Sequence, residues 1–209
     1  LNGLRVAHAF AEMDPSAVVL LCAVELCSLH MSYGWHPEQV VANALFADGA
    51  AAVVASAGPP MSDRDLVLQG SGSIVIPNSA DLMHWEIGDR GFSMGLSPLV
   101  PATVGAALLP WFQDWLQTRA VDLSEIRSWA VHPGGPKILS TCAEALGLDP
   151  RLLDDSRVVL QDHGNMSSAT ILFILERLRR RSVAGPCLAL AFGPGLSAEL
   201  ALLDLQVVV

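Results

Sequence analysis

The sequence predicts an α/β protein whose mixed sheets are covered by helices. Short apolar segments alternate along the chain with longer segments of helical periodicity, which is typical of layered α/β folds. Most of the short segments, such as residues 17–24 and 50–55, are apolar throughout, as expected for strands buried on both faces. Hydrophobic residues make up 52% of the 209 residues, so the chain can form a large core, a buried subunit interface, or both.

Spacing and chain-breaking residues set the elements of the first part of the chain. Leu4, Ala7 and Phe10 recur at helical intervals, which predicts a helix at the start. Pro37 suits the first turn of a second helix, which Asp48-Gly49 ends. The expected elements are a helix over 1–10, a strand over 17–24, a helix over 36–46, a strand over 50–55 and a half-exposed strand over 66–76.

The second part of the chain begins with a polar stretch over 77–89, which is expected to be a connection. Pro110 is expected to kink the long apolar helix that follows, and Gly147 suits the end of the next helix. Two strands joined by a short turn close the chain and should pair antiparallel. The expected elements are helices over 100–117, 136–146 and 166–179, strands over 129–131, 187–192 and 198–205, and a short element over 155–161.

Charge and cysteine usage exclude several classes of function. The net charge is −9, from 12 basic and 21 acidic residues, which argues against a nucleic-acid partner because phosphates need a basic surface. No apolar run reaches the roughly 20 residues of a membrane span. The cysteines form no Cys-x-x-Cys pair, which favours reduced thiols in a cytoplasmic protein without a metal site. They are Cys22, Cys27, Cys142 and Cys187.

Polar, glycine-rich segments interrupt the apolar pattern at three places. One is His132-Pro133-Gly134-Gly135-Pro136, directly after a strand; the second is Gly164-Asn165-Met166-Ser167-Ser168, before a helix; the third is the last turn, Phe192-Gly193-Pro194-Gly195. Ligands in α/β proteins gather beyond strand ends and at helix starts. Glycine allows a backbone or a substrate to approach closely. These segments are therefore the candidate site.

These three segments, together with Ala44-Leu45-Phe46-Ala47-Asp48-Gly49-Ala50-Ala51-Ala52, resemble the signature of type III polyketide synthases, the chalcone synthase-like enzymes of the thiolase superfamily. The resemblance runs from Leu1 to near the C-terminus, in the order of that family. The related ketoacyl-ACP synthase III enzymes share the His and the Asn, but they usually have His-Gln-Ala-Asn after the strand.

The resemblance implies the thiolase fold, with two similar halves in a five-layer α-β-α-β-α core. Residues 1–60 would be the end of the N-terminal half and residues 61–209 the C-terminal half, so the chain would be an incomplete copy. The implied reaction is extension of a starter acyl-CoA by decarboxylative condensation with malonyl-CoA, followed by cyclisation. The CoA thioesters are substrates, no separate cofactor is implied, and the full-length enzyme is expected to be a homodimer.

The resemblance assigns catalytic roles to His132, Asn165 and Phe46. Decarboxylation leaves an enolate, to which an imidazole N–H and an amide N–H can donate together. Phe46, the gatekeeper, would favour loss of the malonyl carboxylate as neutral carbon dioxide. The nucleophilic cysteine of the family would fall a few residues before Leu1, so the chain alone is expected to be inactive.

Further positions are implied as substrate contacts. Cys27, His30, Met83, Phe92 and Ser167 would line the elongation cavity, with Phe192, Gly193, Pro194 and Gly195 supporting it. Gly134 and Lys137 would lie at the CoA entrance. Two of these have a simpler interpretation: Cys27 as an inert core thiol, and the last turn as a hairpin turn alone. Trp85, which the resemblance does not assign, is taken as a packing or dimer-contact residue.

Three alternatives remain at this stage. One is a ketoacyl-ACP synthase III-like condensing enzyme that uses a carrier protein. Another is a non-catalytic thiolase-fold paralogue, which would lack the upstream cysteine. The third is a nucleophilic role for Cys27 itself.

Overall fold

The computed structural model describes residues 1–205 apart from 32, 34, 36, 63, 64, 90 and 182, and it confirms a mixed α/β fold. The described strands form a two-stranded β1–β2 sheet, a four-stranded sheet in the order β3-β8-β7-β6, and a two-stranded β4–β5 hairpin. All strand pairs are antiparallel except β6–β7. The strands are β1 (Val18–Glu25), β2 (Gly49–Ser56), β3 (Leu66–Val75), β4 (Met83–Gly88), β5 (Gly91–Leu96), β6 (Ser128–Val131), β7 (Gly185–Gly193) and β8 (Ser197–Leu205).

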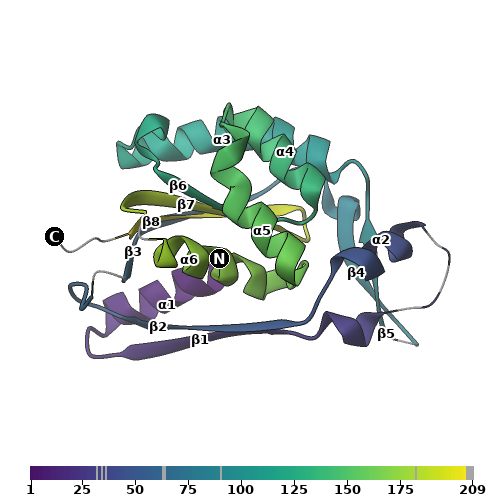
Figure 1. Ribbon diagram of the computed structural model, residues 1–209, viewed down its shortest axis with the longest axis horizontal. Helices are drawn as coiled ribbons and strands as arrows, with labels where there is room; N and C mark the ends of the chain where they lie inside the picture. Colours follow the sequence, from purple (N-terminus) through teal and green to yellow (C-terminus); the bar gives the residue numbers. More distant parts are fainter. Residues whose placement is uncertain are drawn as a thin grey trace.

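The helices lie in layers on these sheets (Figure 1). Helices α3 and α4 cover one face of the four-stranded sheet, while α1 and α6 lie between its other face and the β1–β2 sheet. The α-helices are α1 (Asn2–Met13), α2 (Pro37–Leu45), α3 (Val100–Arg119), α4 (Pro136–Leu146), α5 (Asp154–His163) and α6 (Thr170–Arg180). Short 3-10 helices are η1 (Cys27–His30), η2 (Ala80–Leu82), η3 (Leu123–Glu125), η4 (Pro150–Leu153) and η5 (Ser167–Ala169).

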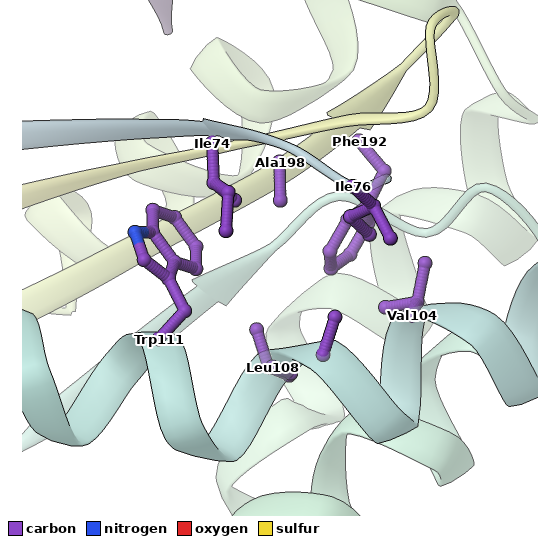
Figure 2. A pocket seen from close by; sticks show the side chains of 8 residues that line it. Ile74, Ile76, Val104, Leu108, Trp111, Phe192 and Ala198 are labelled. Atoms are coloured by element: carbon purple, nitrogen blue, oxygen red, sulfur yellow. The ribbon is translucent and has the colours of Figure 1, made fainter. Parts of the chain in front are cut away.

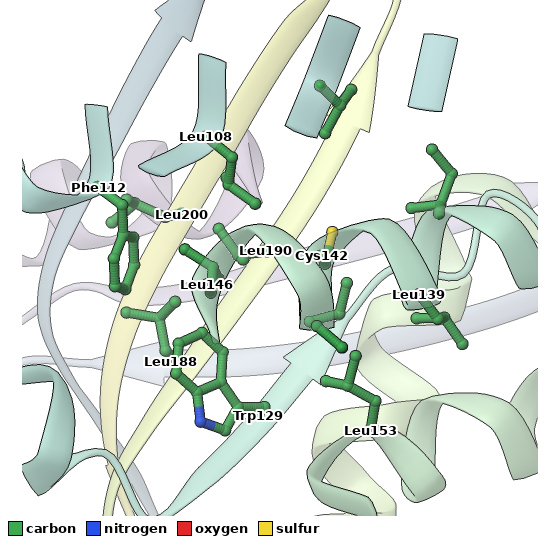
Figure 3. Close-up of a cluster of buried hydrophobic side chains, with 14 of the residues drawn as sticks. Leu108, Phe112, Trp129, Leu139, Cys142, Leu146, Leu153, Leu188, Leu190 and Leu200 are labelled. Atoms are coloured by element: carbon green, nitrogen blue, oxygen red, sulfur yellow. The ribbon is translucent and has the colours of Figure 1, made fainter. Parts of the chain in front are cut away.

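The main core lies between α3, α4 and the four-stranded sheet (Figure 3). Phe112 of α3 and Trp129 of β6 are fully buried there, with ring centroids 5.8 Å apart. A second core packs α6 against Cys187 and Ala189 of β7 on one side and against the β1–β2 sheet on the other. The second core therefore joins the sheets on either side of the boundary expected near residue 60.

One expectation about the first sheet is wrong. Residues 17–24 and 50–55 do form strands, but their side chains are partly buried on one face and exposed on the other. The outward side chains are apolar and exposed: Val18 (72%), Leu20 (64%), Val24 (64%) and Val54 (69%). Among the described residues no layer covers this face, so four of the five expected layers are present.

The segment 77–89 is another correction, because it contains η2 and β4 rather than a simple connection. The sequence pattern did not reveal this strand, because β4 pairs with β5 and most of its side chains are exposed. Its polar residues therefore resemble those of a connecting loop. Gly95 makes the pairing possible: a Cβ there would lie 2.3 Å from the His84 ring across the hairpin. Helix α6 also starts later than expected, because Ser167 has a φ of +49°, which is not helical.

An ion-pair cluster ties α5 to α6. The buried Asp155 carboxylate accepts from Arg177 Nε at 2.7 Å and from Arg181 Nη1 at 2.6 Å. The basic run at the end of α6 is therefore partly a structural clamp rather than only a solvated helix end. The clamp closes the base of the α5–α6 hairpin, whose connection carries Asn165.

Replacing Asp155 with Asn should lower the free energy of unfolding by about 1–2 kcal/mol, because two arginines lose their common acceptor but remain able to reach solvent. Asp154→Asn is the matched control, since its pair with Arg157 is exposed and should be worth less than about 0.5 kcal/mol. Urea unfolding of both variants measures the difference. Equal midpoints would show that the clamp contributes nothing.

Candidate functional site

The β1–β2 ladder ends at the pair Glu25 and Gly49, and the loop that carries Asn165 is fastened there. The Glu25 carboxylate accepts from the hydroxyl and the N–H of Ser168. At Gly49, a Cβ would lie 2.5 Å from the Met166 sulfur, so only glycine leaves room for this side chain. The loop that carries Asn165 is thereby held at the end of β1 and β2.

A second carboxylate holds the neighbouring 3-10 helix. Asp48 accepts from the N–H and the hydroxyl of Ser28, both at 2.7 Å. These two bonds lower the pKa of Asp48 below its usual value, the hydroxyl contributing more. They join the segment after Phe46 to η1, which contains Cys27 and His30.

The backbones of Phe46 and Asn165 form a parallel bridge. The Ala47 N–H donates to the Asn165 carbonyl at 2.9 Å, and the Asn165 N–H donates to the Leu45 carbonyl at 2.8 Å. Gly164, with a φ of +74°, allows this approach, because a Cβ would lie 2.9 Å from the Ala47 methyl. Two residues 119 positions apart are thus direct backbone neighbours.

The side-chain amide of Asn165 has a defined orientation. Asn165 is 2% exposed, and its Oδ1 accepts from the Ser167 N–H at 2.9 Å. Because a backbone N–H can only donate, this bond determines which end of the amide is the oxygen. Within the described residues, Nδ2 has no hydrogen-bond partner. Its two N–H groups are therefore free to donate to a ligand.

His132 follows β6, and its N–H donates to the Leu190 carbonyl of β7 at 2.8 Å. The ring is 9% exposed, and its nitrogens make no hydrogen bond to the described part of the chain. Burial lowers the pKa of His132 to about 4, and the positive α-amino group of Leu1 adds a smaller effect. The imidazole is therefore neutral near pH 7, and the start of α1 lies beside it.

The loops of His132 and Asn165 meet at Leu45. Its carbonyl accepts from the Asn165 N–H, and its side chain lies 3.8 Å from where a Cβ of Gly135 would be. The structure thus gathers His132, Phe46 and Asn165 around one segment, although they come from three different parts of the chain. A neutral imidazole and an oriented amide are both groups that can donate to a carbonyl oxygen or an oxyanion.

A cavity of about 590 Å³ adjoins this site. Three of the expected cavity residues, Cys27, His30 and Ser167, line it, and so does the expected gatekeeper Phe46. The sequence interpretation missed Trp85 and Met94, which are cross-strand partners in the β4–β5 hairpin and also line the cavity. The Trp85 ring lies 5.7 Å from the His30 ring. Strand alternation alone could not have found Trp85, because Met83 on the same strand face packs against the main core.

The other expected cavity residues lie elsewhere. Met83 packs against the main core instead of lining the cavity. Phe192 points into a separate crevice with Trp111 and Ile76, too narrow for a water molecule (Figure 2). Gly193, Pro194 and Gly195 form the turn between β7 and β8 and do not line the cavity. Phe92 pairs with Ile87 in the hairpin, and its side chain lies outside the described part.

The two residues expected at the CoA entrance lie at the start of α4. The Gly134 N–H donates to the His132 carbonyl at 3.0 Å, and Lys137 is exposed in the first turn. A lysine in the first turn of a helix, near the positive end of its dipole, is a suitable contact for a phosphate.

The cysteines of the chain are poorly suited to nucleophilic attack. Burial, Glu25 and Asp48, in that order, raise the pKa of Cys27, so it is a thiol at neutral pH. Burial raises the pKa of Cys142 to about 12 and that of Cys187 to about 11. The structure therefore opposes a nucleophilic role for Cys27.

Two other kinds of feature are absent from the described residues. The described residues contain no cluster of three His, Cys, Asp or Glu side chains arranged to hold a metal ion. None of the described helices combines the length and the hydrophobicity that crossing a membrane requires.

The layered α/β fold defines a member of the thiolase superfamily. Residues 67–206 match the family described as chalcone and stilbene synthases, C-terminal domain. The chain belongs to this family, that of the type III polyketide synthases.

Known relatives agree with this assignment. The chain is 36% identical over 207 residues to 1,3,6,8-tetrahydroxynaphthalene synthase of Streptomyces peucetius subsp. caesius, covering 96% of the chain and 55% of that protein. It is 30% identical to the alpha-pyrone synthesis polyketide synthase-like Pks18 of Mycobacterium tuberculosis, covering 98% of the chain and 54% of that protein. The crystal structure of PKS-I from Ectocarpus siliculosus superimposes with a TM-score of 0.92 at 27% identity, covering 99% of the chain and 57% of that chain. The chain thus spans about half the length of these relatives.

The low pKa of His132 makes stability depend on pH. An unfolded histidine takes up a proton near pH 6.5, whereas the buried ring resists protonation down to about pH 4. The 209-residue chain should therefore lose roughly 3 kcal/mol of stability as the pH falls through this window. His132→Gln should lose less over the same range. Thermal unfolding from pH 7 to 4 tests this, and parallel curves for the two proteins would contradict it.

Proposed function

We propose that this chain forms part of a type III polyketide synthase, an acyltransferase that extends a starter acyl-CoA with malonyl-CoA. The observation that carries the proposal is the orientation of Asn165. Its Oδ1 is held by the Ser167 N–H while Nδ2 is free, beside the gate residue Phe46 and the loop of a neutral His132. Such donors stabilise negative charge that develops on a thioester oxygen.

The chemistry proceeds in two steps around this pair. First, the bond between the malonyl carboxylate and the α-carbon breaks; its electron pair forms an enolate, and carbon dioxide leaves. His132 and Asn165 donate to the enolate oxygen, while the apolar ring of Phe46 disfavours the charged carboxylate. The α-carbon then attacks the acyl thioester, forming a carbon–carbon bond, and the cysteine leaves as thiolate.

The remaining roles follow from position. The nucleophilic cysteine lies outside this chain, because the pKa values of Cys27, Cys142 and Cys187 are raised. Lys137 and the Gly134 loop contact the CoA phosphate groups. The growing chain occupies the 590 Å³ cavity, where it cyclises. We also propose that the full-length enzyme is a homodimer.

The direct test is expression of the full-length coding sequence and assay with labelled malonyl-CoA and a panel of acyl-CoA starters. We expect polyketide products from the native enzyme. His132→Ala and Asn165→Ala should each lower kcat by about 100- to 1000-fold, as removal of one oxyanion donor does. His8→Ala, an exposed change on α1, is the control and should have no effect. Absence of product from every starter, with no cysteine found upstream, would refute the proposal.

Trp85 should limit the length of the product. Because its ring forms one wall of the cavity beside His30, Trp85→Ala in the full-length enzyme should allow at least one further condensation from the same starter. Ile87→Ala, in the same strand but 81% exposed, should leave the product unchanged. Mass spectrometry of the products distinguishes the two variants. The same product from wild type and Trp85→Ala would exclude Trp85 as the limiting wall.

A further inference from the structure

Glu25 connects the first sheet to the loop of the oxyanion donor. It is the last residue of β1 and is half-buried, and it lines the cavity. Its Oε1 accepts from the Ser168 hydroxyl and, at 3.3 Å, from the Ser168 N–H. One oxygen of the carboxylate is thus committed to a residue 143 positions away.

Ser168 is linked to the Asn165 amide through the intervening Ser167. Ser168 is bonded to Ser167, whose N–H holds the Asn165 Oδ1 at 2.9 Å. Ser167 has a φ of +49°, a left-handed conformation that costs a non-glycine residue about 1 kcal/mol or more. Such a conformation persists only where surrounding contacts enforce it. Glu25 fastens Ser168, the residue after Ser167, through hydrogen bonds. Burial fixes Met166, the residue before Ser167.

We propose that Glu25 is a positioning residue: through Ser168 and Ser167 it holds the Asn165 amide with its N–H groups directed at the substrate. This inference rests on the proposed polyketide synthase function, which it extends by one residue. The other role open to a carboxylate at the cavity wall is that of a general base. The two roles make different demands, because positioning needs an acceptor oxygen whereas proton transfer needs an ionisable group.

The distinguishing variants are Glu25→Gln and Glu25→Ala in the full-length enzyme. Gln keeps an acceptor oxygen for Ser168, while Ala removes it. For malonyl-CoA decarboxylation we expect Ala to lower kcat about tenfold or more with KM unchanged, because only transition-state stabilisation is lost. Gln should restore most of that kcat, and Ser168→Ala, which keeps the N–H, should lie between. Glu86→Ala, an exposed carboxylate change in β4, is the control.

Two activity outcomes would overturn the inference while leaving the polyketide synthase proposal intact. If Glu25→Ala retains wild-type kcat, then Glu25 does not position Asn165. If Gln and Ala lose activity equally while melting temperatures stay unchanged, the carboxylate acts by proton transfer instead.

A structural measurement keeps the inference testable if the native enzyme makes no product. The side-chain amide signal of Asn165 in a ¹⁵N–¹H NMR spectrum, assigned with Asn165→Asp, reports its orientation without turnover. A shifted or broadened signal in Glu25→Ala, restored in Glu25→Gln, supports the positioning role. A signal that is the same in wild type and Glu25→Ala overturns it.

Discussion

The end of the β1–β2 ladder is the constraint on which the rest of the site depends. Glu25 and Gly49 form its last pair, and from this point one carboxylate reaches Ser168 while the missing side chain of Gly49 admits Met166. Asp48, one residue before Gly49, fastens η1 through Ser28. All these contacts start at the end of one pair of strands. The loop of Asn165 and the helix η1, which come from distant parts of the chain, therefore keep a defined position relative to each other.

Some polar groups of the site have hydrogen-bond partners within the protein, whereas others have none among the described residues. The carboxylates of Glu25 and Asp48 accept hydrogen bonds from serines. Burial raises the pKa of Cys27, and the negative charges of these two carboxylates raise it further. Asn165 Nδ2 and the His132 ring, by contrast, have no partner in the described structure. These groups can donate to a ligand that carries an accepting oxygen.

The layers explain why the site lies where it does. Helix α6 is packed between two sheets, and the clamp at Asp155 holds the base of the α5–α6 hairpin. The connection between α5 and α6, which carries Asn165, therefore lies at the end of the β1–β2 ladder. The β4–β5 hairpin contributes Trp85 and Met94 to the wall of the cavity. The outer face of β1–β2 remains apolar and exposed in the described part of the chain.

The sequence by itself determined the fold class, most helices and strands, and the chemical character of the site. Apolar periodicity and glycine or proline stops are local signals, and His132, Asn165 and Phe46 stand in motifs specific enough to identify a family. Only the tertiary structure decided that β1 and β2 are bare on one face, that residues 83–96 form a hairpin, and that Trp85 rather than Met83 lines the cavity. The anchoring role of Glu25 was likewise hidden, because its partner lies 143 residues away. Burial and long-range pairing depend on which elements pack together, and no local pattern carries that information.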